Sequence, residues 1–350
     1  MPNQRELAKR LGMSQSTVSL ALRGSPLIAQ ATRERVRAAA AAMGYAPHPM
    51  VASLMERIRT ARAVKDAGCI AILVDFPDKQ AWFDFHLAYR QQYEAIERRA
   101  GKRGYRTECF FLQAPGMSPA VIDRILHARG IVGVILAGPR TATSIDGPAM
   151  AWERYAWIKS GYTWEGARMD CVSADNRQHV ELAFAELARR GRRRVGYCIS
   201  RRMVPRANNN WVAGYLIAQR RLPAAARIPM FVTDPTPAGQ ARFARWLRRW
   251  RPDAIIGGMT EQAWLAQWAS DATATGHDNG TPPEFCVRWR WPGGTTCSIE
   301  ENAPVIGETL CDLLLEKIIH NERGLPAHPR TVLIQGTWHE PHLPPLTGRI

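Results

Sequence analysis

The sequence lacks the segments that mark membrane and secreted proteins. No run approaches the roughly 18 apolar residues of a membrane-spanning helix, and the start MPNQRELAKR has no apolar secretion core. The cysteines are odd in number and form no CxxC pair, so we expect reduced, buried thiols at Cys69, Cys109, Cys171, Cys198, Cys286, Cys297 and Cys311. A soluble, cytoplasmic protein is therefore expected.

The common catalytic signatures are also missing. No GxxxxGK, GxSxG, HExxH or nucleotide-type GxGxxG motif occurs. His339, Glu340 and His342 could suggest a metal site, but Pro341 prevents them from sharing one helix, which favours a surface loop. We expect no enzyme activity, no cofactor and no metal.

Positive charge is present in excess, and the first 62 residues carry more of it per residue than the rest of the chain does on average. Residues 1–62 hold ten Lys and Arg against three Glu, a net of +7, whereas the other 288 residues hold 37 basic against 28 acidic residues, a net of +9. Such a basic segment suits the neutralisation of nucleic-acid phosphates. A second basic run, at residues 189–194, ends a predicted helix, where cations favour the helix dipole; a second DNA patch is the less favoured interpretation.

The basic segment has the pattern of a helix-turn-helix. Helical spacing of apolar residues predicts a helix from about Asn3 to Leu11, and Gly12 permits a sharp turn. Ser14 can cap the next helix, which we expect from about Gln15 to Leu22. A third helix, from about Gln30 to Met43, closes the small domain.

Short polar side chains remain exposed on the second of these helices. Val18 and Leu22 are expected to face the core, which leaves Gln15, Ser16, Thr17, Ser19 and Leu20 pointing outward. In a major groove, Gln can recognise adenine and Ser can contact several base edges. The alternative is a three-helix packing module with no nucleic-acid role, and the local charge argues against it.

Three pieces, RELAKRLGMSQSTVSLALRGS, TRERVRAAAAAMGYAPHP and ASL, resemble the DNA-binding head of the lactose-repressor/galactose-repressor (LacI/GalR) family of bacterial transcription regulators. The resemblance implies base reading by Gln15, Ser16 and Leu20. The full set of DNA-binding positions that we carry over is Gln4, Ser14, Gln15, Ser16, Thr17, Ser19, Leu20, Arg23, Tyr45, Pro47, His48 and Leu54.

After Pro47 the resemblance implies a hinge helix that folds on DNA. Leu54 matches the leucine that members of the family insert between base pairs of the minor groove. The alternative is that Leu54 packs only against its twin hinge. The chain departs from the family at His48, where Asn is usual, and at Val51 and Ala52, where Ala-Arg is usual.

The remaining chain alternates short apolar runs with amphipathic stretches, as repeated βαβ units do. Together with the resemblance, this predicts an all-α helix-turn-helix head on an α/β, periplasmic-binding-protein-like body of two doubly wound parallel-sheet subdomains. The expected boundaries are 1–46 for the head, 47–66 for the hinge and 67–345 for the effector-binding and dimerisation domain. Within the body we expect an N-subdomain of about 67–165 and 297–325, and a C-subdomain of about 166–296 and 326–345.

A ligand cleft is expected between the two subdomains, at the carboxyl ends of the strands. Candidates for effector binding at strand ends and in the following loops are Asp75, Phe76, Trp82, Phe85, Arg140, Asn209, Trp211 and Trp291. Aromatic faces with Asn and Asp suit a carbohydrate-like ligand, although aromatic residues are often core. The family commonly has an Arg where Trp211 stands and an Asp near Trp291, so the ligand is expected to be held differently, to differ or to be absent.

These patterns predict a homodimeric, sequence-specific transcriptional regulator, most simply a repressor, on a near-palindromic DNA operator. A small effector would act through the cleft. Two alternatives remain: a sugar-binding protein with a vestigial head, and a DNA binder that needs no ligand.

Overall fold

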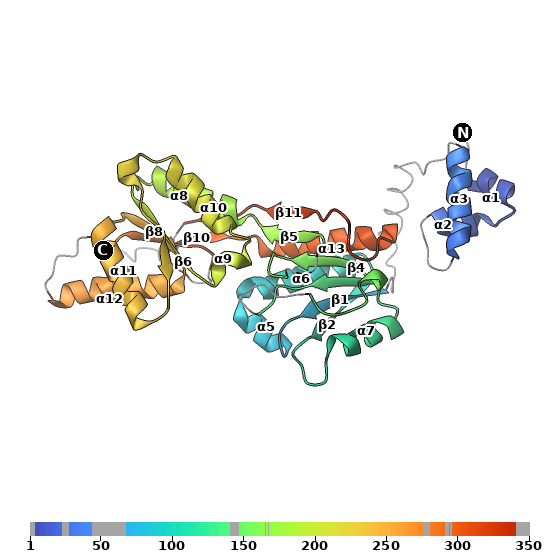
Figure 1. Cartoon of the computed structure of the whole chain (residues 1–350), viewed down its shortest axis with the longest axis horizontal. Coiled ribbons are helices and arrows are strands. Elements are labelled where there is room, and N and C mark those ends of the chain that lie inside the picture. Colours follow the sequence, from blue (N-terminus) through green and yellow to red (C-terminus); the bar gives the residue numbers. More distant parts are fainter. Residues whose placement is uncertain are drawn as a thin grey trace, which may run out of the picture.

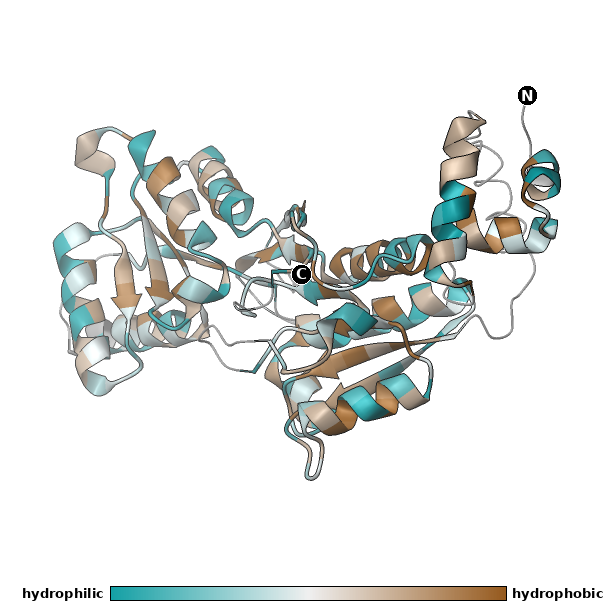
Figure 2. Ribbon diagram, turned by 45° about the vertical axis from the view of Figure 1, so that its right-hand side comes forward, coloured by the Kyte–Doolittle hydropathy of each residue, from teal (hydrophilic) through white to brown (hydrophobic). Residues whose placement is uncertain are grey.

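The computed structural model describes residues 4–22, 28–43, 68–140, 147–164, 166, 168–275, 281–290, 294 and 296–340. Figure 1 shows a small helical head and a body of two sheet-containing halves. In Figure 2, hydrophobic residues concentrate in the strands and on the inner sides of the helices that cover them. Among the described residues, no helix is long and apolar enough to cross a bilayer.

The head consists of α1 (Gln4–Leu11), α2 (Gln15–Leu22) and α3 (Gln30–Ala42). Its core is formed by one apolar stripe from each helix, as the spacing predicts: Leu7, Ala8, Val18, Ala21, Val36 and Ala40 are buried. The three helices therefore have the expected bounds to within one or two residues.

The first half contains a six-stranded sheet in the order β11-β5-β4-β3-β1-β2, in which all pairs are parallel. Its strands are β1 (Gly68–Val74), β2 (Tyr105–Phe111), β3 (Gly133–Leu136), β4 (Ala156–Ser160), β5 (Cys171–Ala174) and β11 (Thr331–Ile334). Because β1 is buried on both faces, it reads as a continuous apolar run.

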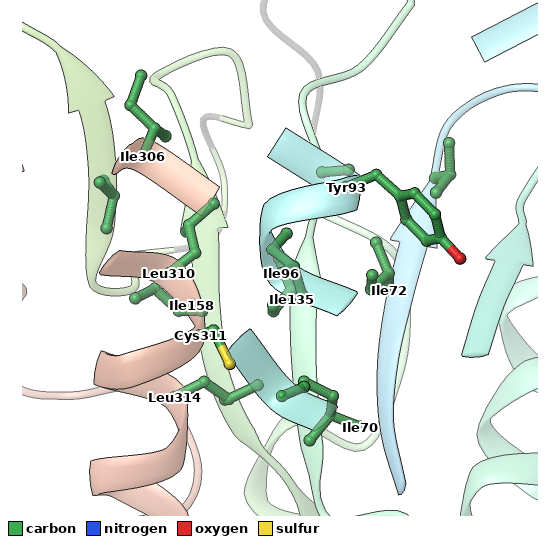
Figure 3. Close-up of a cluster of buried hydrophobic side chains, with 14 of the residues drawn as sticks. Ile70, Ile72, Tyr93, Ile96, Ile135, Ile158, Ile306, Leu310, Cys311 and Leu314 are labelled. Carbon is green, nitrogen blue, oxygen red and sulfur yellow. The ribbon is translucent and has the colours of Figure 1, made fainter. Parts of the chain in front are cut away.

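Helices cover both faces of this sheet. The long helices α6 (Leu87–Lys102) and α13 (Ala303–His320) pack on one face, where Ile70 and Ile72 of β1 meet Leu310 and Leu314 in the cluster shown in Figure 3. Helix α7 (Pro119–Ala128) packs on the other face. The shorter α5 (Lys79–Phe85) and the 3-10 turn η1 (Trp152–Arg154) lie in the connections.

The second half repeats this plan with the strand order β12-β10-β9-β8-β6-β7, parallel except for the β10–β12 pair. Its strands are β6 (Val195–Ser200), β7 (Phe231–Thr233), β8 (Ala254–Gly257), β9 (Glu284–Val287), β10 (Cys297–Glu300) and β12 (Thr337–His339). One face carries α8 (Asn176–Arg189) and α10 (Asn210–Arg220), and the other carries α11 (Pro237–Trp250) and α12 (Met259–Thr275). The short α9 (Met203–Arg206) and the 3-10 turn η2 (Ala224–Ala226) complete this half.

The chain crosses between the halves three times, and hydrogen bonds join the crossings. The Asp175 amide donates to the Ile334 carbonyl at 2.8 Å, and Asn302 Nδ2 donates to the Gln335 carbonyl at 2.7 Å. His179 packs beneath Gly336 with no partner for either ring nitrogen among the described residues. Burial lowers the pKa of His179 despite the nearby carboxylates of Glu301 and Asp175, so the ring is held neutral.

Strand membership differs from the expected subdomain boundaries at three places. Strands β5 and β11, expected in the C-subdomain, belong to the first sheet, and β10, expected in the N-subdomain, belongs to the second. The reason is the strand pairing: β11 pairs in parallel with β5, which is distant in sequence, and β10 pairs in parallel with β9, which directly precedes it among the strands. The first half therefore extends through Ala174 before the chain crosses.

The seven cysteines form no disulfide. Five are buried, whereas Cys69 and Cys109 are half-buried, so the expectation of buried thiols holds fully for five. Burial raises the pKa of Cys171 and Cys311 to about 12, which keeps both as unreactive thiols.

Candidate functional site

The first candidate surface is the beginning of α2 in the head. Gly12 adopts φ +64°, which allows the chain to turn directly from α1 into α2. Ser14 then caps α2, because its Oγ accepts the Thr17 amide at 3.0 Å, and a 2.8 Å bond joins its Oγ to Thr17 Oγ1. The Nη2 of Arg35 on α3 donates to the Leu11 carbonyl at 3.2 Å and fixes the other side of the turn.

This cap leaves the first residues of α2 facing solvent. Gln15 and Ser16 are exposed, while Thr17, Ser19 and Leu20 are half-buried. Gln4 lies at the start of α1, and the remaining predicted DNA-binding residues lie outside the described part of the chain: Arg23, Tyr45, Pro47, His48 and Leu54. The structure thus places the α2 candidates on one short helix, with Gln15 and Ser16 the most exposed of them.

The second candidate site is a cavity of about 290 Å³ between the halves of the body. It opens at the carboxyl ends of the strands, where β4 and β5 contribute Ser160, Ser173 and Ala174. Residues from α5, α6, α8, α9, α10 and α13, and from the loops between elements, line the rest. Its volume suits a ligand of a few tens of atoms or fewer.

Aromatic rings from both halves form its walls. Phe85 and Tyr89 stack in the first half with centroids 6.0 Å apart, and Phe85 is 48% exposed toward the open space. Trp211 and Trp289 face them from the second half, and the rings of Trp289 and His86 approach to 5.9 Å. Such faces stack on the apolar face of a ring-shaped ligand.

Polar groups complete the lining. Asn176 begins α8 immediately after β5, and the Asn176 and Glu301 side chains have no hydrogen-bond partner among the described residues. Gln92 accepts a 2.9 Å bond from Ser160 Oγ at the same wall. An amide and a carboxylate that face a cavity can bind ligand hydroxyl groups.

One arginine joins the two halves across the cavity. Arg206 Nη2 donates to Tyr89 Oη at 2.7 Å and to the Pro139 carbonyl at 3.2 Å. Desolvation raises the pKa of Tyr89, with Arg206 acting in the opposite direction, so the hydroxyl remains protonated at neutral pH. Any movement of one half against the other must stretch or break these bonds.

A second arginine stands behind the aromatic wall. Arg288 follows β9 and is 6% exposed, with its guanidinium 5.7 Å from the Trp211 ring and 5.2 Å from the Trp289 ring. Its Nη1 donates to the Cys198 carbonyl at 2.5 Å. The Arg288 guanidinium therefore makes a cation–π contact with Trp211, although residue 211 itself carries no charge.

The predicted effector residues divide between the cavity and its surroundings. Phe85 and Trp211 line the cavity, and Trp291 lies outside the described residues. Asp75 instead accepts bonds from Gln113 Nε2 and the Arg140 amide. The remaining four candidates do not line the cavity either: Phe76 and Trp82, which are buried in the core, Asn209, which occupies the N-cap position of α10, and Arg140. Arg140 itself is exposed outside the cavity.

Sequence reasoning missed Tyr89, Asn176, Arg206, Trp289 and Glu301. Asn176 could have been found, because it lies two residues after the short apolar run that forms β5. Glu301 follows a strand that the sequence did not reveal. Among the described residues, no group of His, Cys, Asp and Glu could hold a metal ion, and His342 lies outside them.

Residues 5–48 match the sequence profile of the family described as "Bacterial regulatory proteins, lacI family". The match covers the helical head and not the body. A comparison with curated protein sequences found no match.

Solved structures share the fold of this chain over most of its length. The complex of the transcriptional regulator CelR with cellobiose is 16% identical with a TM-score of 0.53, over 97% of this chain and 99% of that one. The Lac repressor bound to ONPG in the repressed state has the same identity and TM-score, over 97% and 98%. A LacI-family regulator from Rhizobium etli is 16% identical with a TM-score of 0.57, over 78% and 98%. The chain therefore has the fold of a LacI-family DNA-binding transcriptional regulator, with a periplasmic-binding-protein-like body.

Proposed function

We propose that this chain is a homodimeric transcriptional repressor whose two heads bind a near-palindromic operator in the bacterial cytoplasm. The observation that carries the proposal is the capped start of α2, which exposes Gln15 and Ser16 on a head with net positive charge. One head offers too few base contacts for selectivity, so two-fold pairing on a symmetric site supplies the rest.

We further propose that a small carbohydrate-like molecule occupies the cavity and regulates the repressor without being chemically converted. Aromatic faces at Phe85, Tyr89 and Trp211, with unpartnered polar groups at Asn176 and Glu301, support this ligand class. The relative CelR was solved with cellobiose, and another relative from Enterococcus faecium with ribose. A ligand that changes the approach of the halves would act on operator affinity through the dimer geometry.

A second candidate is a DNA binder that needs no effector. It is favoured by one observation: Arg206 already joins the halves across the cavity through Tyr89 and Pro139. The two candidates differ in whether any small molecule changes operator affinity.

The proposal is tested by selecting duplexes from a random pool with the full chain. We expect a near-palindromic consensus, two chains per duplex by mass, and an affinity that falls with salt by roughly 0.9 log units per log unit of salt for each phosphate contacted. An unselective mixture of duplexes, or one chain per duplex, would contradict it. Saccharides are then screened by thermal shift; a binder at a hundred times its Kd adds about 2.7 kcal/mol to stability.

If no saccharide shifts the melting temperature or the operator affinity, the ligand-independent alternative replaces the effector part of the proposal.

A further inference from the structure

Positive charge is distributed unequally between the two halves of the body. Residues 176–300 contain 19 arginines and nine acidic residues, whereas residues 68–175 contain 13 basic and 12 acidic residues. The excess therefore belongs to the second half, and the cavity accounts for little of it, since Arg206 is its only arginine among the described lining residues.

Most of this charge lies at the amino edge of the second sheet. Strands β6 and β8 pair in parallel, so the segments that precede them lie side by side. Arg194, just before β6, donates to the Ala225 carbonyl at 2.7 Å and to the Arg251 carbonyl at 3.3 Å, which brings a third segment to the same place. Residues 189–194, 220–227 and 248–251 together form what we call the arginine surface: Arg189, Arg190, Arg192, Arg193, Arg194, Arg220, Arg221, Arg227, Arg248, Arg249 and Arg251.

Carboxylates neutralise only part of the arginine surface. Arg189 pairs with Glu186, Arg190 and Arg192 with Glu284, and Arg221 with Glu181. Although the Arg193 amide donates to Asp253 Oδ2 at 2.7 Å, the guanidinium groups of six exposed arginines have no carboxylate partner within the described chain: Arg193, Arg220, Arg227, Arg248, Arg249 and Arg251. The basic run near residue 190 is thus more than a helix end, because two distant segments add unpaired charge to it.

We propose that the arginine surface binds the phosphate backbone of a second DNA duplex, without reading its sequence. Guanidinium groups form forked bonds with phosphate oxygens, and their attraction needs no apolar contact. A protein partner would need a buried apolar anchor. None of the large exposed apolar side chains of the described chain lies in the three segments; the surface offers only half-buried Leu222 and Trp250.

The position of the surface determines what such binding achieves. The described body begins at Gly68, at the amino edge of the first sheet, and the carboxyl ends of strands in both halves face the shared cavity. The amino edge of each sheet therefore points away from the cavity, and Figure 1 shows β1 and β8 in two separate halves of the body. The arginine surface is separate from the edge at which the described body begins, so we take the duplex bound there to be a second DNA segment, distinct from the one that the heads hold. Only this distinction between two segments depends on the proposed function.

The test uses the full chain with a neutralised head, Arg5→Gln/Lys9→Gln/Arg10→Gln, so that the body is the main remaining DNA-binding surface. Into it are placed either the surface triple, Arg220→Gln/Arg248→Gln/Arg249→Gln, or a matched control triple of exposed first-half arginines, Arg98→Gln/Arg124→Gln/Arg168→Gln. Fluorescence anisotropy of a labelled random duplex is measured at several salt concentrations.

We expect the surface triple to weaken duplex binding at least tenfold and to reduce the slope of log affinity against log salt by up to about 2.7, at roughly 0.9 per phosphate. The control triple should change affinity less than twofold. Equal effects of the two triples, or binding of polyglutamate with no binding of duplex, would overturn the proposal. Loss of the palindromic consensus in the unmodified chain would instead contradict the proposed function and leave this result standing.

Discussion

A buried ion pair in the first half permits a quantitative prediction. The carboxylate of Asp170, before β5, lies 2.9 Å from Lys317 Nζ on α13, and the two side chains are only 3% and 4% exposed. Arg330, before β11, approaches the same carboxylate at 2.8 Å but is 55% exposed. The Asp170 carboxylate therefore connects the starts of β5 and β11 with α13, at the edge of the sheet opposite the cavity.

Replacing Asp170 by Asn leaves the buried Lys317 ammonium without its main partner. Removing one member of a buried pair typically costs 3–5 kcal/mol; because Lys317 keeps the half-exposed Glu322 at 3.3 Å, we expect about 3 kcal/mol. Arg330→Gln, which removes the exposed partner, should cost under about 1 kcal/mol. The double variant Asp170→Asn/Lys317→Met no longer has the unpaired buried ammonium and should recover at least half of the unfolding free energy that Asp170→Asn loses.

The same pair gives stability a defined dependence on pH. Burial alone would raise the pKa of Asp170, but bonds from Arg330 and Lys317 lower it below its ordinary value of 3.8. The contribution is therefore complete above the ordinary pKa and is lost as pH falls through the lowered one. Urea unfolding followed by tryptophan fluorescence should show Asp170→Asn less sensitive than wild type to acid below about pH 4. Equal stability of both proteins at neutral pH would refute the reasoning.

Three further predictions concern the head, the crossings and the cavity. Ser14→Ala should destabilise the head by about 1 kcal/mol in circular-dichroism melting, with Ser16→Ala as a nearly silent control; equal melting of both would exclude the cap. Gly336→Ala places a Cβ 2.5 Å from the ring of His179, so the crossing must shift, and an unchanged His179 resonance would argue against this contact. Arg206→Gln should widen the body in solution scattering; unchanged dimensions would show that this link does not hold the halves together.

The head could be predicted closely because its determinants are local. A cap at Ser14, a turn at Gly12 and one apolar stripe per helix fix three helices without reference to the rest of the chain. The central strands could be predicted for a similar reason, since a strand buried on both faces is a run of apolar residues whatever its partners.

Strands β10, β11 and β12 could not be predicted in this way. Each has only three or four residues, and each is held by a partner far along the chain or across a crossing. The predicted subdomain boundaries were wrong where these strands change sheets.

The cavity was predicted in its location and only partly in its residues. Phe85 and Trp211 could be identified because they are aromatic residues in segments that follow strands. Phe76 and Trp82 are aromatic residues in a similar position, but they belong to the core. Arg206 lies on the short helix α9 and Glu301 lies in a crossing between the halves. Neither segment has a periodic pattern of apolar residues in the sequence, so their place at the cavity could not be predicted.

The central claim is that α2 presents Gln15 to base edges. Its most direct test compares the duplexes selected from one random pool by the wild-type chain and by Gln15→Ala. The account predicts that the variant keeps its fold and its salt dependence but loses base preference at one position in each half of the palindrome, a cost of about 1–3 kcal/mol per contact. An identical consensus from both proteins would contradict it.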